Sequence, residues 1–246
     1  MTYLNFLVIF VIPLVIVGWI YFFKTQYISK SLIKVGLLIL VFLAVIYTTP
    51  WDNYLVKNEI WWYGPDRVLG TLGFVPIEEY FFFVLQTLAT GFWTYFLMTK
   101  IKVKLMSGNF YNLQWMVTLL LFFVFFLGVY LISIDRFRYL SLILVWATPV
   151  LLLQWGVGGR ALIQNGFIYL VALFIPSFYF CFIDLYAIEE SIWKISPVLT
   201  TGVLLFKLPI EEAIFFFVTN LMVVQGLVLL VSMRNEKMVK KYFLKE

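Results

Sequence analysis

Two copies of the tetrapeptide Pro-Ile-Glu-Glu are the residues of this chain best suited to chemistry. They occupy residues 76–79 and 209–212, and a Phe-rich run follows each copy. Paired carboxyl groups can give and take protons, and two acids held close together can share one proton. The chain has no histidine and a single cysteine, Cys181, which excludes imidazole catalysis, histidine metal sites and an intramolecular disulfide. Proton chemistry must therefore use carboxyl groups, tyrosines or lysines.

Each motif also has a purely structural interpretation. Proline at the first helical position, followed by acids in the first turn, is an ordinary helix start that the helix dipole favours. A functional role is favoured because the motif occurs twice and precedes apolar sequence, where ionisable groups are costly. Neighbouring positions on a helix point about 100° apart. We therefore expect one glutamate of each pair to face the helix bundle, although the sequence does not indicate which one.

The elements that carry these motifs are predicted to be transmembrane helices. Of the 246 residues, 63% are apolar and 13% are charged, which is about half the charged fraction of a soluble domain. Seven apolar stretches are long enough to cross a bilayer, namely 4–23, 33–49, 77–98, 114–132, 140–155, 166–182 and 210–232. The sequence therefore predicts an all-α integral membrane protein. The connections over about 50–76 and 183–209 are expected to lie along the outer membrane interface.

The distribution of charge predicts the orientation in the plasma membrane. Twelve of the 18 Lys and Arg residues fall in segments 24–34 and 99–113, around Arg160, and after Ser232. The positive-inside rule places these segments in the cytoplasm and the N-terminus outside. Eleven of the 13 acids and six basic residues fall on the other side, so the outer face is predicted to be acidic. The net charge of +5 is then a topology signal, and no nucleic-acid partner is expected.

Matching residues at a nearly constant spacing predict an internal repeat. Tyr3 recurs as Tyr139, Asp52 as Asp184, and the first acidic motif recurs 133 residues later. The predicted organisation has four parts: a first repeat at 1–100, a linker with its own helix at 101–138, a second repeat at 139–232, and a basic cytoplasmic tail at 233–246. One extra helix between two three-helix units keeps both in the same orientation. The repeats are thus predicted to be parallel, with both acidic motifs at the outer surface.

The string PIEEYFFFVLQTLATGFW and its partner LPIEEAIFFFVTNL resemble the lycopene cyclase domain family. This is a small, integral-membrane type of carotenoid cyclase that occurs as two subunits or, as here, with both halves fused. The resemblance covers essentially the whole chain. It implies conversion of the linear ψ-ends of lycopene to β-ionone rings, giving γ- and then β-carotene through a carbocation and without net redox change.

The resemblance also implies the roles of individual residues. The catalytic candidates are Glu78, Glu79, Glu211 and Glu212, followed by Asp52 and Asp184, whose alternative is to be polar loop residues at the membrane surface. One glutamate of each pair is expected to stay protonated and the other ionised. Aromatic faces near the acids would stabilise the cation. The candidates for substrate contact and cation stabilisation are Tyr80, Phe82, Phe83, Gln86, Phe215, Phe216, Asn220, Trp61, Trp62 and Trp193.

No cofactor is expected, because no Gly-x-Gly-x-x-Gly follows a predicted strand. No metal is expected either, because the chain has no histidine and one cysteine. The glycine-rich segment 156–160 is instead predicted to be a cytoplasmic turn after a helix. A retinal protein is disfavoured, since residues 210–232 contain no lysine. A carotenoid-binding protein, a transporter and a cyclase for C50 carotenoid ends stay open as alternatives. The expected partners are membrane lipid, the lycopene substrate and other carotenoid-pathway enzymes, with the chain acting as a monomer or homo-oligomer.

Overall fold

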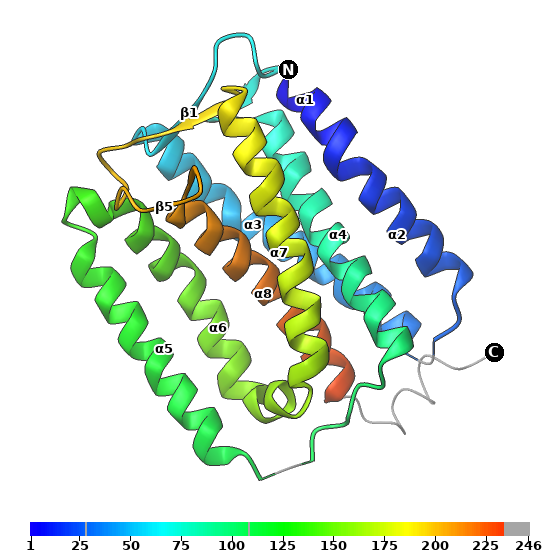
Figure 1. Ribbon diagram of the computed structural model, residues 1–246. Coiled ribbons are helices and arrows are strands. Elements are labelled where there is room, and N and C mark those ends of the chain that lie inside the picture. Colours follow the sequence, from blue (N-terminus) through cyan, green and yellow to red (C-terminus); the bar gives the residue numbers. More distant parts are fainter. Residues whose placement is uncertain (28, 108, 234–246) are drawn as a thin grey trace.

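The fold is a bundle of seven long helices, which confirms the predicted all-α integral membrane class (Figure 1). The computed structural model describes residues 1–27, 29–107 and 109–233. Within these residues, seven helical spans are long and apolar enough to cross a membrane. They are α1–η1–α2 (Tyr3–Phe6, a π-helical turn at Leu7–Val11, then Ile12–Lys24), α3 (Lys30–Lys57), α4 (Ile77–Lys100), α5 (Tyr111–Leu131), η2–α6 (Asp135–Phe137, then Arg138–Gln164), α7 (Gly166–Glu189) and α8 (Ile210–Ser232).

Three of these helices extend further than the sequence predicted. Helix α3 continues through Pro50 to Lys57, and α7 continues to Glu189. Asp52 and Asp184 therefore lie inside helices, and their expected placement in outer loops is wrong. The predicted turn at 156–160 is also wrong, because α6 passes through it and only Gly158 has non-helical backbone angles. Apolarity decreases at each of these points while the backbone remains helical, so a hydropathy criterion ends the helix too early.

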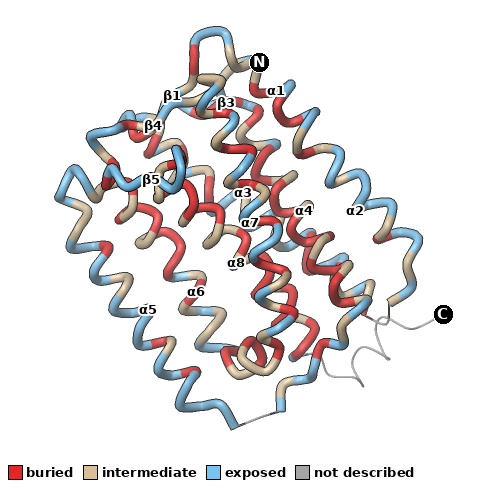
Figure 2. Tube along the Cα trace, viewed as in Figure 1, coloured by how far each residue is buried: buried red, intermediate tan, exposed pale blue. Residues whose placement is uncertain are grey.

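Helices α4 and α8, which begin with the two acidic motifs, form the centre of the bundle. Helix α4 contacts α2, α3, α7 and α8, whereas α8 contacts α3, α4, α6 and α7. Figure 2 shows long buried stretches on α4 and α8 and a largely exposed α5, which packs along α6. The central pair thus places both motifs between the two halves of the chain.

Six short strands lie at the end of the bundle that carries the N-terminus, and none of them was predicted (Figure 1). Strand β1 (Trp61–Tyr63) pairs antiparallel with β4 (Trp193–Ile195), which joins the two halves. Two tight hairpins, β2–β3 (Thr71–Leu72 and Val75–Pro76) and β5–β6 (Leu204–Leu205 and Leu208–Pro209), lead directly into α4 and α8. Each hairpin thereby fixes where its helix begins.

Contacts at matching positions in the two halves support the predicted repeat. The Tyr47 hydroxyl donates to the carbonyl of Trp146 at 2.8 Å, and the Tyr179 hydroxyl donates to that of Phe10 at the same distance. Tyr47 is the counterpart of Tyr179, and Trp146 is the counterpart of Phe10. The same hydrogen bond is therefore formed twice, once from each half to the other. The boundaries of the repeats stay predictions, and the basic tail after Met233 lies outside the described residues.

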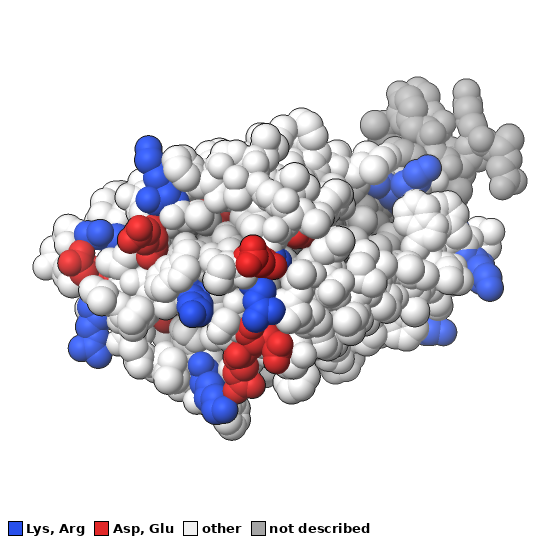
Figure 3. Space-filling view, turned by 90° about the horizontal axis from the view of Figure 1, so that it is seen from above, with Lys and Arg blue, Asp and Glu red and all other residues white. Residues whose placement is uncertain are grey.

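The acids of the strand-bearing end do not form an acidic surface. Figure 3, viewed onto this end, shows acidic and basic side chains interspersed over it. Asp52, Glu78, Asp184, Glu211 and Glu212 are all buried, so they contribute little to the surface charge. Five of the carboxyl groups counted toward the expected acidic outer face therefore lie inside the protein. The orientation in the membrane stays a prediction.

Candidate active site

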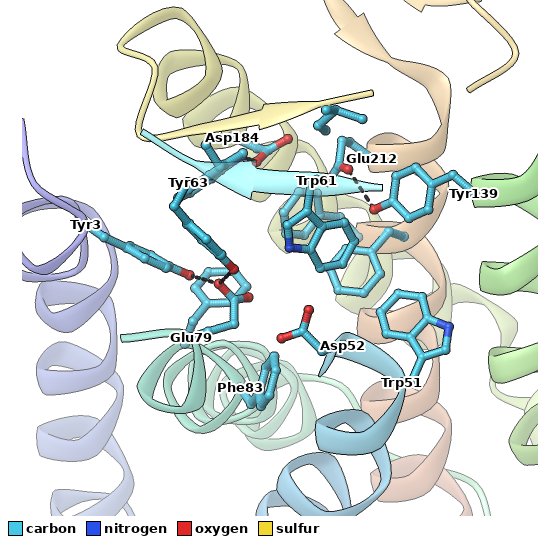
Figure 4. Close-up of a pocket in the computed structure, with 15 residues that line it drawn as sticks. Tyr3, Trp51, Asp52, Trp61, Tyr63, Glu79, Phe83, Tyr139, Asp184 and Glu212 are labelled. Atoms are coloured by element: carbon cyan, nitrogen blue, oxygen red, sulfur yellow. Dashed lines mark hydrogen bonds between the residues drawn. The ribbon is translucent and has the colours of Figure 1, made fainter. Parts of the chain in front are cut away.

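A small cavity lies between the two halves beneath the β1–β4 strand pair (Figure 4). Its volume is about 40 Å³, and it is lined by side chains from both halves of the chain. Four of these are carboxylic acids, and most of the others are aromatic. The lining residues are Tyr3, Trp51, Asp52, Trp61, Tyr63, Glu79, Phe82, Phe83, Tyr139, Asp184, Trp193, Ile195, Glu212, Phe215 and Phe216.

The second glutamate of each Pro-Ile-Glu-Glu motif faces this cavity. Glu79 Oε2 accepts hydrogen bonds from the hydroxyls of Tyr3 at 2.7 Å and Tyr63 at 3.1 Å. Glu212 Oε1 accepts one hydrogen bond, from the Tyr139 hydroxyl at 2.7 Å. Tyr3 and Tyr139 are counterparts in the repeat, so both halves hold this glutamate with a tyrosine from the start of their first helix.

The first glutamate of each motif points elsewhere and does not line the cavity. Glu78 Oε1 accepts the backbone N–H of Leu69 at 2.8 Å, and Glu211 Oε1 accepts that of Thr201 at 2.6 Å. Both side chains are fully buried. They attach the loop before each hairpin to the first turn of the following helix, which is a structural task. The geometry therefore separates the two glutamates that the sequence could not distinguish.

Asp52 and Asp184 complete the set of four acids. They occupy matching positions on α3 and α7, and their exposed fractions are 1% and 2%. Asp184 Oδ1 accepts the indole N–H of Trp193 at 2.9 Å. Within the described part of the chain, neither carboxyl oxygen of Asp52 has a hydrogen-bond partner. A buried carboxylate without donors is costly, so the uncharged acid suits this position better.

Aromatic rings form the rest of the cavity wall. Of the predicted aromatic candidates, Trp61, Trp193, Phe82, Phe83, Phe215 and Phe216 line it. Trp51 was not among the predicted residues; its ring stacks on that of Phe215 with centroids 5.7 Å apart and planes 9° from parallel. Such faces can attract a positive charge in a dry site.

Four predicted contact residues lie outside the cavity. Tyr80 donates its hydroxyl to the Leu72 carbonyl at 2.8 Å, and Trp62 is 40% exposed. Gln86 and Asn220 belong to an interhelical network deeper in the bundle. Gln86 Nε2 donates to Asn220 Oδ1 at 3.3 Å. Asn220 also accepts from the Thr90 hydroxyl at 2.7 Å and donates to the Ser177 hydroxyl at 3.1 Å, which ties α4, α7 and α8 together.

The tyrosines of the cavity were not among the predicted site residues. The match between Tyr3 and Tyr139 in the repeat was a signal that could have found two of them. Tyr63 lies in β1, and its counterpart in the other half is Ile195, so the repeat gave no signal there. Although Tyr63 is only partly buried as a residue, its hydroxyl reaches the cavity. Burial, and then the nearby Glu79 charge, raises the pKa of Tyr63 well above its usual value, which keeps the hydroxyl a donor.

The described residues contain no group of three or more Cys, Asp and Glu side chains arranged to hold a metal ion. Each of the four cavity acids lies next to a hydroxyl, an indole or an aromatic ring, and carboxyl groups can give and take protons. The two halves are unequal. Glu79 accepts two hydroxyl donors and Glu212 accepts one, whereas Asp184 has an indole donor and Asp52 has no hydrogen-bond partner among the described residues.

Comparison with known families gives the class of the protein. The family model described as lycopene cyclase matches residues 1–98 and 136–230. The chain belongs to the lycopene cyclase family. The two matched segments contain both acidic motifs and nearly coincide with the predicted repeats, and the gap between them contains α5. The family membership predicted from the motifs is thus confirmed.

Curated relatives with this domain occur in archaea and fungi. A lycopene beta-cyclase of Halobacterium salinarum is 41% identical over 194 residues, which cover 79% of this chain and 81% of the relative. A bifunctional lycopene cyclase/phytoene synthase of Blakeslea trispora is 31% identical over 91% of this chain and 38% of its own length. One of Neurospora crassa is 36% identical over 80% of this chain and 34% of its own length. No solved structure matches this lycopene cyclase family member.

Proposed function

We propose that this protein is a lycopene beta-cyclase, which closes the linear ψ-ends of lycopene into β-ionone rings by acid–base catalysis. The observation that carries the proposal is the enclosure of four carboxyl groups by aromatic faces in one cavity at the strand-bearing end of the bundle. The family match and the similarity to the lycopene beta-cyclase of Halobacterium salinarum support the choice of substrate.

The reaction requires three events in a site without free water. A proton adds to the terminal double bond and leaves a tertiary cation. The electrons of the next double bond along the chain attack this cation, which forms the ring bond and moves the positive charge into the ring. Loss of a ring proton then restores a double bond. The atoms and electrons balance without an oxidant, so carboxyl groups that give and take a proton are sufficient.

We assign the proton-donating role to Asp52 and the proton-accepting role to Glu79. The absence of donors around Asp52 in the described chain supports an uncharged acid. The hydroxyls of Tyr3 and Tyr63 support a charged Glu79, since hydrogen bonds to a carboxylate stabilise its ionised form. Glu212 and Asp184 complete the set on the other side and can return the site to its starting protonation state.

The aromatic wall has two tasks in this proposal. The faces of Trp61 and Trp193, from the paired strands, and of Phe83 and Phe215, from the central helices, would stabilise the cation by about 2 kcal/mol or more in a dry site. The cavity of about 40 Å³ is far smaller than a ligand pocket, which usually measures about 300–1,000 Å³. A lycopene end therefore enters only when aromatic rings of the wall move apart. Because one lycopene end occupies this cavity at a time, γ-carotene forms first, and the second end reacts in a second binding event.

Cyclisation in deuterated water tests the proposal. Purified protein in lipid nanodiscs would receive lycopene in D₂O, and the products would be separated and weighed by mass spectrometry. We expect γ- and β-carotene that carry one deuterium per ring, because the added proton comes from an exchangeable acid and a substrate hydrogen leaves. Unchanged lycopene would support the carotenoid-binding or transport alternatives instead. Cyclic product without deuterium would contradict the acid–base mechanism, and conversion of C50 ends alone would change the substrate.

A further inference from the structure

Two apolar grooves flank the bundle, one on each side of the central helices. The first, which we call the α3–α6 groove, has a volume of about 310 Å³ and is lined by residues of α3, α4, α6 and α8. The second, the α2–α7 groove, has a volume of about 490 Å³ and is lined by α2, α4 and α7. Both run along faces that the seven-helix architecture turns toward lipid.

The two grooves are counterparts in the repeat. Leu43 and Tyr47 line the α3–α6 groove, and their counterparts Ile175 and Tyr179 line the other. The hydroxyls of both tyrosines are bound to backbone carbonyls, so each tyrosine presents mainly its ring. Grooves with matching residues therefore flank the acid cavity on both sides.

One position differs between the two grooves at the end nearest the acid cavity. The residue of α3 nearest the strand-bearing end of the α3–α6 groove is Thr48, and its counterpart is Phe180. Phe180 is 1% exposed; it stacks on Phe216 at 5.8 Å and meets Phe82 edge-on at 5.9 Å. Since Phe82 and Phe216 line the acid cavity, the Phe180 ring stands between that cavity and the α2–α7 groove.

The α3–α6 groove, by contrast, shares two wall residues with the acid cavity. Phe83 and Phe215 line both spaces, so the two meet at these rings. A further apolar space of about 440 Å³ extends this groove toward the lipid and shares Trp51 with the acid cavity. From Leu40 to Pro50 the groove follows α3 for about 15 Å, which is half the thickness of a bilayer core.

We propose that the α3–α6 groove binds the polyene chain of the substrate, with the reacting end inserted between Phe83 and Phe215. The α2–α7 groove is closed to the reacting end by Phe180. This inference rests on the proposed cyclase function and adds the route by which a long apolar substrate reaches the acids. A conjugated polyene suits this groove because an apolar chain needs an apolar surface that leads to the acid cavity. Since the polyene is rigid, it loses little conformational entropy on binding.

Two alanines allow a matched test. Ala44 lines the α3–α6 groove and Ala89 lines the α2–α7 groove, and both are partly buried. Ala44→Phe should fill the first groove and lower kcat/KM for lycopene by about tenfold or more, as overfilling a shaped site does. Ala89→Phe should leave kcat/KM close to that of the wild type. A graded series, Ala44→Val and Ala44→Leu, should lower the rate in order of side-chain size, which separates groove filling from misfolding.

A binding measurement separates this inference from the proposed function. The two alanine variants would each be placed in a Glu79→Gln background, and lycopene retained on the purified protein would be measured by absorbance. We expect Ala44→Phe to lose bound lycopene and Ala89→Phe to retain it. Equal lycopene retention and equal cyclisation rates for the Ala44→Phe and Ala89→Phe substitutions would overturn the inference. Lipid acyl chains would then be the occupants of the groove. If the wild type formed no ring but Ala44→Phe still lost lycopene, the groove would stand and the cyclase function would fall.

Discussion

Exchange of each glutamate of the first motif for glutamine gives the sharpest test of the site. The two side chains are adjacent in sequence, yet Glu79 faces the acid cavity and Glu78 binds the Leu69 backbone. Glutamine has nearly the same shape and size, so the substitution removes the acid function and leaves the packing almost unchanged. The two variants should therefore fail in different ways.

The structure sets the magnitude of each effect. Glu79→Gln removes a group assigned to proton transfer, and loss of general acid–base catalysis lowers kcat by about 10²–10⁴-fold. Glu78→Gln keeps an oxygen for the Leu69 N–H but buries an amide where Oε2 has no partner in the described chain. Because Oε2 already lacks a partner in the wild type, the exchange should change the folding stability by at most about 1–3 kcal/mol. The rate per folded molecule should stay within about threefold of the wild type.

The assay compares rate and stability in the same preparation. Ring formation would be followed by chromatography of the pigments at saturating lycopene, and the unfolding midpoint would be measured in the same detergent. The pair Glu212→Gln and Glu211→Gln repeats the comparison in the second half. A hundredfold loss of rate for Glu78→Gln at an unchanged unfolding midpoint would refute the assignment, as would full activity of Glu79→Gln.

Two further predictions concern stability. In the unfolded chain the Tyr63 hydroxyl loses its proton near about pH 10, whereas in the folded protein burial and the Glu79 charge hold the pKa of Tyr63 well above that value. The contribution of this hydroxyl to folding stability is complete below about pH 10 and is lost as the pH rises. Between about pH 10 and 11.5, the thermal unfolding midpoint of the wild type should therefore fall more steeply than that of Tyr63→Phe. Parallel curves of midpoint against pH for the two proteins would contradict this. Asn220→Ala breaks the hydrogen bonds to Gln86, Thr90 and Ser177. At about 0.6–1.7 kcal/mol per interhelical hydrogen bond, the free energy of unfolding should fall by about 2 kcal/mol or more, with little change in the cyclisation rate per folded molecule. A loss of activity without a loss of stability would return Asn220 to the site.

The sequence predicted the parts of the fold that depend on local pattern. Long apolar runs showed the seven helices, and Pro76 and Pro209 marked where α4 and α8 begin, because proline favours the first turn of a helix. The end of α3 was missed, since Asp52 follows Pro50 in a polar aromatic stretch that reads as a loop. Tertiary packing keeps the helix intact there and turns the aspartate inward.

The choice between adjacent glutamates could not be read from the sequence. A helical step of about 100° separates Glu78 from Glu79, and only the neighbours decide which side chain meets the cavity. Those neighbours are Tyr3, at the start of the first helix, and Leu69, in a loop. Tyr63 was harder still, because it reaches Glu79 only through the β1–β4 pairing, and strands of three residues have almost no sequence signature.

The difference between Tyr63 and its counterpart Ile195 has a consequence for how such a protein can evolve. A site built at the axis between two identical chains would carry the same residue on both sides, so every change would occur twice. Ring closure, however, needs unlike groups, one that gives a proton and one that takes it. Covalent fusion of the two halves lets each side change alone. One glutamate can then gain a second hydroxyl donor and one groove can be closed, while the other half keeps its earlier form.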